Sequence, residues 1–325
     1  MEAIDFVILW VDGNDPDWQK KRKKYDKTTE IDEVRYRDYG TLKYLFRSIE
    51  TYCPWVNRIH LITDHQIPEW LNIDHPKVNL VFHDDFIPQE YLPTFNSNVI
   101  ELNLFRLDEL SEKFILFNDD MFINNNIEPE DFFRGQDILD YGVYNKIAPN
   151  EEFAHVLVND LLFINRFFNK KDSIKKNWKK QFRLRYGREL LKNFLLLPWF
   201  DIPGYYNHHL PQPHFKSIFK KLYHLDSEVF ERTSKNKFRD YDDINHWICR
   251  YWLLEEGRYI PQRLSFGKYL TVSEVEKIQS VIKKGKAKVI CVNDESSDGE
   301  QFDARMENLL NAFREKFPSK SAYEK

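Results

Sequence analysis

Acidic side chains stand directly after short apolar runs of this 325-residue chain, where they could bind a cation. The runs and their acids are Ile4–Leu9 with Asp12, Phe114–Phe117 with Asp119 and Asp120, and Lys288–Val292 with Asp294. Clustered carboxylates repel one another unless a cation or a basic partner compensates their charge. Mg²⁺ prefers oxygen ligands and often combines one or two carboxylates with substrate phosphates. Three such loops converging on one sheet edge would indicate a metal–phosphate site, whereas an isolated Asp-Asp pair more often caps a helix or forms a turn.

Two arginine-containing segments could supply the opposite charge. They read Arg35-Tyr36-Arg37-Asp38 and Lys237-Phe238-Arg239-Asp240. A guanidinium group is a planar fork that matches two phosphate oxygens at once. Either segment taken alone is equally well explained by a surface ion pair with its neighbouring aspartate.

The stretch from Asn207 to His214 holds three histidines, at 208, 209 and 214, and two prolines fix it locally. Histidine can act as a general acid or base near neutral pH or can bind a transition metal. Cysteine and glutamate are missing at zinc-site spacing, which argues against zinc. We expect two of the three histidines to be structural.

The elements that position these residues alternate between strand-like and helix-like patterns. Further short runs at 58–63 and 79–83 resemble strands, and Leu42, Leu45, Phe46 and Ile49 fall on one helical face that Pro54 ends. Asn96 or Ser97 could cap a following helix. Such alternation predicts a mostly parallel α/β sheet flanked by helices, whose ligands gather beyond the carboxyl ends of the strands.

Composition narrows the class of protein. A formal net charge of −4 argues against a nucleic-acid binder, and 42% hydrophobic residues are too many for disorder. Three distant cysteines predict neither a disulfide framework nor a zinc site, and no signal peptide or spanning segment is recognisable. The sequence lacks the P-loop motif, the dinucleotide-binding fingerprint, the nucleophile-elbow motif and the HExxH motif. A cytoplasmic enzyme is the simplest interpretation.

One segment departs from the near-neutral average. Residues 169–192 contain ten lysines and arginines and two acids, interleaved with apolar residues. A solvated helix pair with snorkelling lysines would explain the pattern. The alternative is a basic face for anionic lipid headgroups or for an acceptor that carries pyrophosphate.

Taken together, these segments resemble the Stealth-type sugar-1-phosphate transferases, which include bacterial capsular and exopolysaccharide phosphotransferases and the lysosomal-enzyme N-acetylglucosamine-1-phosphotransferase. All four of the family's blocks occur in order over nearly the whole chain. They correspond to Ile4–Pro16, Arg35–Phe122, His209-Leu210-Pro211 with Phe238-Arg239, and Cys291-Val292-Asn293-Asp294. His65 stands where a glycine is expected after Thr63-Asp64, which predicts a differently shaped loop there.

The resemblance implies a Rossmann-like fold of the nucleotide-sugar-transferase (GT-A-like) type and a reaction. A sugar 1-phosphate, with N-acetylhexosamine as the first choice, would pass from a UDP-sugar to a hydroxyl of an acceptor glycan, releasing UMP. The cofactor would be Mg²⁺ or Mn²⁺. The alternatives are a conventional metal-dependent glycosyltransferase that releases UDP and, from another class, a catalytically silent glycan-binding protein.

Site roles follow from the same resemblance. Asp119, Asp120, His209 and Arg239 would be catalytic, with His209 and one of the two aspartates acting as a coupled base and Arg239 binding phosphate. Donor binding would fall to Asp12, Gly13, Asn14, Arg37, Asp38, Asn96, Asn118 and Asn293. Asp120 and Asp294 would hold the metal.

We expect a single catalytic domain over residues 1–325. Within it, residues 1–135 would form the nucleotide-sugar-binding half, about 136–204 a helical basic insertion that faces the acceptor or the membrane, and 205–325 the completing half. The partners would be the UDP-sugar and a glycan acceptor that could be lipid-linked, without nucleic acid. Residues 169–192 could hold the protein peripherally at the inner face of the cell membrane, and the sequence leaves the oligomeric state open.

Overall fold

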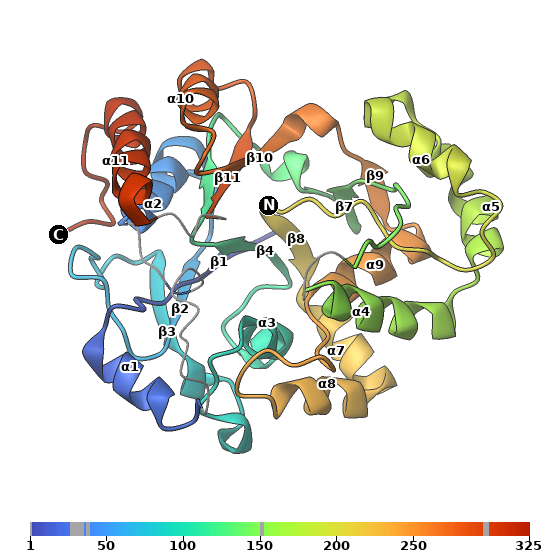
Figure 1. Cartoon of the computed structure of the whole chain (residues 1–325), viewed down its shortest axis with the longest axis horizontal. Coiled ribbons are helices and arrows are strands. Elements are labelled where there is room, and N and C mark those ends of the chain that lie inside the picture. Colours follow the sequence, from blue (N-terminus) through green and yellow to red (C-terminus); the bar gives the residue numbers. More distant parts are fainter. Residues whose placement is uncertain (1, 27–35, 37–39, 150–152, 295–298) are drawn as a thin grey trace.

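The first apolar run of the chain forms the middle strand of a five-stranded sheet (Figure 1). A computed structural model describes the chain except for residues 1, 27–35, 37–39, 150–152 and 295–298. The strands of this central sheet, in spatial order, are β3 (Val78–Phe82), β2 (Ile59–Thr63), β1 (Ile4–Leu9), β4 (Lys113–Asn118) and β8 (Gln212–Phe215). The first four run parallel, and β8 runs antiparallel to β4. The predicted mostly parallel α/β fold is therefore confirmed.

Strand composition explains why this sheet lies inside the molecule. Phe6, Val7 and Ile8 are fully buried although they point alternately to opposite faces of the sheet. Parallel sheets are covered by helices on both faces, so their central strands are apolar throughout. Because these strands are held inside the molecule, the loops that follow them leave the central sheet at a defined edge, at the carboxyl ends of the strands.

Helices surround the central sheet (Figure 1). Their bounds are α1 (Pro16–Lys23), α2 (Leu42–Tyr52), α3 (Ser97–Asn103), α4 (Ala154–Phe167), α5 (Lys170–Gln181), α6 (Leu190–Leu195), α7 (Lys216–Leu225), α8 (Ser227–Ser234), α9 (Trp247–Glu256), α10 (Val275–Lys284) and α11 (Gly299–Lys316). The predicted apolar face of α2 is buried. Asn96 is the residue that caps α3, since its side chain accepts from the backbone N–H of Asn98.

Two loops that carry acidic residues emerge at the same edge of the central sheet. Leu9 of β1 lies opposite Asn118 of β4 in parallel register. The loop with Asp12 and the turn with Asp119 and Asp120 therefore follow neighbouring strand ends, as the sequence predicted.

The third acidic loop belongs to a different sheet. After the Asp119-Asp120 turn the chain enters β5 (Met121–Ile123), which pairs antiparallel with β11 (Val289–Asn293), and β11 pairs in parallel with β10 (Gly267–Thr271). The prediction that all three acidic loops converge on one sheet edge is therefore wrong for the loop with Asp294. Asp294 follows β11 of this second sheet, which the Asp119-Asp120 turn connects to the central sheet.

The segment from 136 to 204 contributes α4, α5 and α6. It also contains β7 (Asp137–Asp140), which forms a third sheet with β6 (Phe133–Arg134) and β9 (Tyr259–Pro261). A 3-10 helix over Leu184–Glu189 connects α5 to α6. None of the helices that the structure describes is long and apolar enough to span a membrane.

His65, the residue in place of the expected glycine, has a φ of 60°. Left-handed backbone is costly for a residue with a Cβ, and histidine is among the side chains that tolerate it best. Its ring stacks on Phe82 with centroids 4.5 Å apart, and its Nε2 lies 3.0 Å from an Asp84 carboxylate oxygen. These contacts help to hold a backbone conformation that glycine would adopt without strain.

Candidate active site

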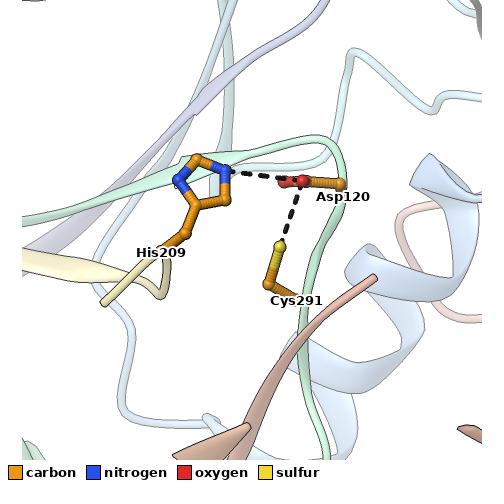
Figure 2. Close-up of side chains that lie close together, drawn as sticks. All are labelled: Asp120, His209 and Cys291. Carbon is orange, nitrogen blue, oxygen red and sulfur yellow. Dashed lines mark hydrogen bonds and ion pairs between the residues drawn. The ribbon is translucent and has the colours of Figure 1, made fainter. Parts of the chain in front are cut away.

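Asp120 lies at the junction of the central and second sheets, and residues of both approach it. Its backbone carbonyl accepts from Val292 N–H at 2.9 Å, and its Oδ2 accepts from the Cys291 thiol at 3.1 Å (Figure 2). Its Oδ1 is buried and has no hydrogen-bond partner among the described residues. Burying a carboxylate oxygen without a hydrogen-bond partner costs desolvation free energy, which a bound cation would offset. This atom is therefore a candidate ligand for a cation.

His209 faces Asp120 from the loop before β8. Figure 2 shows the imidazole pointing toward the carboxylate, with Nε2 3.5 Å from Oδ2. The same nitrogen lies 3.4 Å from Asn118 Nδ2, at the end of β4. About two fifths of the His209 side chain is exposed (39%), so a substrate hydroxyl can reach it.

The protonation of His209 is set by competing effects. Burial acts to lower the pKa of His209, but the charge and hydrogen bond of Asp120 and the charge of Glu101 outweigh it, and the net pKa is raised. The imidazole therefore has increased affinity for a proton. That property suits a group that accepts a proton from an attacking hydroxyl.

The other two histidines of the stretch are enclosed. Burial lowers the pKa of both His208 and His214 to about 3, so each ring stays neutral. His208 packs edge-on against Tyr141, and His214 Nε2 lies 2.9 Å from His246 Nδ1. Their surroundings agree with the structural role expected for two of the three histidines.

A buried ion pair supports the loop that carries His209. Arg250 contacts both oxygens of Asp140 at 2.8 Å, and both side chains are fully buried. Arg250 also donates to Asn207 Oδ1 at 2.9 Å, and Tyr251 O–H donates to the same oxygen at 2.9 Å. Asn207 is thus fixed two residues before His209.

Glu101 is a residue of this region that sequence reasoning missed. Burial raises the pKa of Glu101 to about 7, against the opposing effects of the Arg239 charge, a backbone hydrogen bond from His246 and the His209 charge. Arg239 donates to Ser97 Oγ at 3.1 Å, one turn before Glu101 on α3. A single acid on an otherwise apolar and amide-rich buried helix was the available signal.

The loop after β1 is tightly held. Gln66 accepts from Asp12 N–H through its Oε1 and donates through its Nε2 to Asp12 O and Asp15 Oδ2, each at 2.9 Å. Asp12 Oδ1 accepts from Asn14 N–H at 2.9 Å. A Cβ on Gly13 would lie 2.1 Å from the Tyr36 carbonyl oxygen, so this close approach requires glycine. The loop is preorganised, with Asp12 and Asn14 on a fixed backbone.

The remaining predicted residues lie in varied settings. Asn96 is buried, and its Nδ2 donates to Phe238 O at 3.2 Å and to Asp243 Oδ2 at 2.7 Å. Asn293 is half-buried and donates to Tyr269 O–H at 2.7 Å, and Asp294 follows it at the end of β11. Arg37 and Asp38 lie outside the described residues.

Asp120, His209 and Cys291 form a possible metal site, with one ligand atom from each lying within 4.8 Å of the others. Burial and the neighbouring Asp120 and Asp119 raise the pKa of the Cys291 thiol well above its ordinary value. The protonated thiol donates a hydrogen bond to Asp120 Oδ2, and it would have to lose its proton to bind a metal ion. The unpartnered Asp120 Oδ1 is an oxygen ligand of the kind that Mg²⁺ or Mn²⁺ takes, so the donor set fits such an ion.

Comparison with known proteins places the chain in a family. Residues 2–30 match Stealth protein CR1, conserved region 1, and residues 35–140 match Stealth protein CR2, conserved region 2. The chain belongs to the Stealth family of capsular and exopolysaccharide phosphotransferases, and it is an enzyme.

Three relatives show how far the similarity extends. Capsular polysaccharide phosphotransferase WcwK of Streptococcus pneumoniae is 44% identical over 100% of this chain and 99% of its own. Exopolysaccharide phosphotransferase cps2G of Lactiplantibacillus plantarum is 40% identical, covering 99% and 96%. Receptor polysaccharide phosphotransferase WefC of Streptococcus gordonii is 35% identical, covering 100% and 99%. Among solved structures, the galactosyltransferase LgtC with donor and acceptor sugar analogs overlaps 96% of this chain and 95% of its own at 11% identity, with a TM-score of 0.42.

Proposed function

We propose that this enzyme transfers a sugar 1-phosphate from a UDP-sugar to a hydroxyl of an acceptor glycan, forming a phosphodiester and releasing UMP. The observation that carries the proposal is the Asp120–His209 pair, in which a partly exposed imidazole faces a largely buried carboxylate at the strand edge that also presents the Asp12 loop. The names of the full-length relatives, all polysaccharide phosphotransferases, support the same reaction. N-acetylhexosamine is the leading choice for the sugar.

The proposed chemistry takes place at the phosphorus that bears the sugar. The acceptor oxygen forms a bond to this phosphorus, and the bond from phosphorus to the oxygen that bridges the two phosphates breaks. UMP leaves with that oxygen and its electron pair. His209 Nε2 takes the proton of the attacking hydroxyl, and Asp120 holds the imidazole in place and stabilises its positive charge.

Charge on the phosphoryl oxygens must be neutralised during transfer. Arg239 beside Ser97 and a metal ion held by Asp120 Oδ1 and Asp294 are the proposed neutralising groups. A bound Mg²⁺ would supply electrostatic stabilisation of the diphosphate. Removal of divalent ions with a chelator should abolish transfer, and Mg²⁺ or Mn²⁺ should restore it.

Donor recognition is assigned to the loop after β1. Asp12, Gly13 and Asn14 have a backbone that Gln66 holds in one conformation, so little ordering is required on binding. Asn118 contacts His209 at the end of β4, and Asn293 is the last residue of β11. From these two positions, both side chains would reach the donor phosphates. Asn96 would act through its support of the Phe238 backbone, next to Arg239.

The acceptor side is assigned to the helical segment at 136–204. An acceptor glycan anchored on a lipid would place the enzyme at the inner face of the cell membrane, and the basic residues of 169–192 would favour an anionic surface.

A donor screen tests the proposed reaction. Incubation with UDP-N-acetylglucosamine, UDP-N-acetylgalactosamine, UDP-glucose or UDP-galactose and acceptor should release UMP with one of them. Release of UDP from every accepted donor would instead show conventional glycosyl transfer. A matched incubation with Asp120→Asn protein measures background hydrolysis.

A further inference from the structure

α5 and α6 lie at the right-hand edge of the molecule in Figure 1, and α6 with the loop after it carries a group of exposed apolar side chains. We call this group the apolar face; its members are Leu191 (60% exposed), Phe194 (51%), Leu195 (65%), Leu197 (45%), Trp199 (58%) and Phe200 (75%). Leu191, Phe194 and Leu195 follow helical spacing on one side of α6, while Asn193 between them is buried. Six exposed apolar side chains within ten residues, on one helix and the loop that follows it, indicate an interaction site.

A row of lysines borders the apolar face. Lys171, Lys175 and Lys179 lie one turn apart on the exposed side of α5, and none of them forms an ion pair with a described residue. The Lys171 ammonium lies 5.3 Å from the centroid of the Phe200 ring, so the first lysine of the row contacts the apolar face. Lys170 is buried beneath them and donates to the Trp199 carbonyl at 2.8 Å, which ties the loop after α6 to α5.

We propose that the apolar face and the lysine row together dock this enzyme on an anionic lipid bilayer. Aromatic and leucine side chains beside a row of lysines form the amphipathic pattern of interfacial membrane binding, in which apolar groups enter the headgroup boundary and cations face anionic lipids. The positive border favours an anionic bilayer over a second copy of this chain, because two like-charged borders would repel each other. The membrane contact therefore combines the lysines of α5, which belong to the basic segment 169–192, with apolar side chains at 191–200 that extend beyond it.

The helix that carries the apolar face is connected by hydrogen bonds to the segment that leads to His209. Asn193 accepts from Tyr144 N–H at 2.7 Å and donates to Gly142 O at 3.0 Å. Tyr144 forms a bridge to Tyr205, four residues before His209, and the Lys192 ammonium lies 5.3 Å from the Tyr206 ring. Docking would therefore hold the loop that carries His209 near the bilayer, where a lipid-linked acceptor would present its hydroxyl. This last point rests on the proposed function, whereas membrane binding itself does not.

Vesicle co-sedimentation of the full-length protein tests the proposal. The protein should sediment with phosphatidylcholine vesicles that contain phosphatidylglycerol, and only weakly with phosphatidylcholine alone. Leu195→Ser with Phe200→Ser should weaken binding by at least about tenfold, because two apolar side chains no longer enter the bilayer. Lys175→Gln with Lys179→Gln should weaken it about fivefold for each lysine and reduce its dependence on salt.

A matched control removes exposed apolar groups elsewhere. Ile67→Ser with Ile73→Ser, at positions 45% and 44% exposed, should leave vesicle binding unchanged. Absence of binding, or equal binding by the control and the Leu195→Ser, Phe200→Ser protein, would overturn the proposal. The proposal would also be overturned if the wild-type protein did not bind vesicles but formed a dimer in solution that the Leu195→Ser, Phe200→Ser protein fails to form. Asp120→Asn protein, which should lose transfer, should still bind the vesicles, so failure of docking and failure of the proposed transfer are measured separately.

Discussion

Arg250 and Asp140 form a fully buried, two-pronged ion pair beneath the loop that presents His209. The two residues are 110 positions apart in the chain and come from α9 and the end of β7. Through Asn207, which Arg250 also contacts, the pair links the third sheet to the loop that carries His209. The position of His209 therefore depends on a buried ion pair that holds Asn207, two residues before it in the chain.

Arg250→Met should destabilise the protein by about 3–5 kcal/mol, because it leaves the Asp140 carboxylate buried without its partner. Urea denaturation at neutral pH measures the change. Arg58→Met, which removes an exposed ion pair with Glu109, is the matched control. It should lower the free energy of unfolding by less than about 1 kcal/mol. Equal effects of the two substitutions would contradict the structural role of the buried pair.

Asp120→Asn and His209→Ala should each abolish transfer while leaving the fold intact. Both side chains face the edge where the substrates would meet, and neither belongs to the apolar core. Turnover with a saturating donor, together with circular dichroism of each variant, checks the prediction. Near-normal turnover in either variant would remove that residue from the proposed mechanism.

Cys291→Ser should retain most activity, and Cys291→Ala should retain less. A hydroxyl can replace the thiol as the donor to Asp120, whereas alanine leaves that carboxylate oxygen without it. Activity titrated against Mg²⁺ should give similar metal requirements for the wild-type and serine proteins. A large rise in the metal requirement of Cys291→Ser would instead identify the sulfur as a metal ligand.

Glu101 should make stability depend on pH. Its pKa is about 7 in the folded protein and 4.5 ordinarily, so the folded state holds the proton more tightly, and stability is lost as the pH rises from 4.5 through 7. Glu101→Gln should reduce the loss of unfolding free energy between pH 5 and pH 8 by about 2–3 kcal/mol. The exposed Glu90→Gln provides the control, and an unchanged pH profile in Glu101→Gln would contradict a buried, proton-binding carboxyl.

The strands and the acidic loops were predictable because both signals are local. The apolar run Ile4–Leu9 coincides with β1, and Asp119 and Asp120 follow β4 because a polar turn must end a buried strand. The parallel register of β1 and β4 then brings the two loops together. A pattern within a few residues was sufficient for these features.

The contacts that complete the site depend on distant pairing. Cys291 reaches Asp120 across 171 residues, through the pairing of β11 with β5, and no spacing rule connects them. Gln66 stabilises the Asp12 loop from the end of another strand. Glu101 is an acid on a buried helix, and its pKa depends on burial, which the order of residues does not specify.

The proposed reaction breaks the bond between phosphorus and the bridging oxygen of the UDP-sugar, and phosphorus NMR of the purified product shows whether it does. With its accepted UDP-sugar and a glycan acceptor, the enzyme should give a product with one phosphodiester resonance coupled to the anomeric proton of the transferred sugar. UMP should be formed in equal amount. A product without phosphorus, accompanied by UDP, would contradict the proposed transfer of a sugar 1-phosphate.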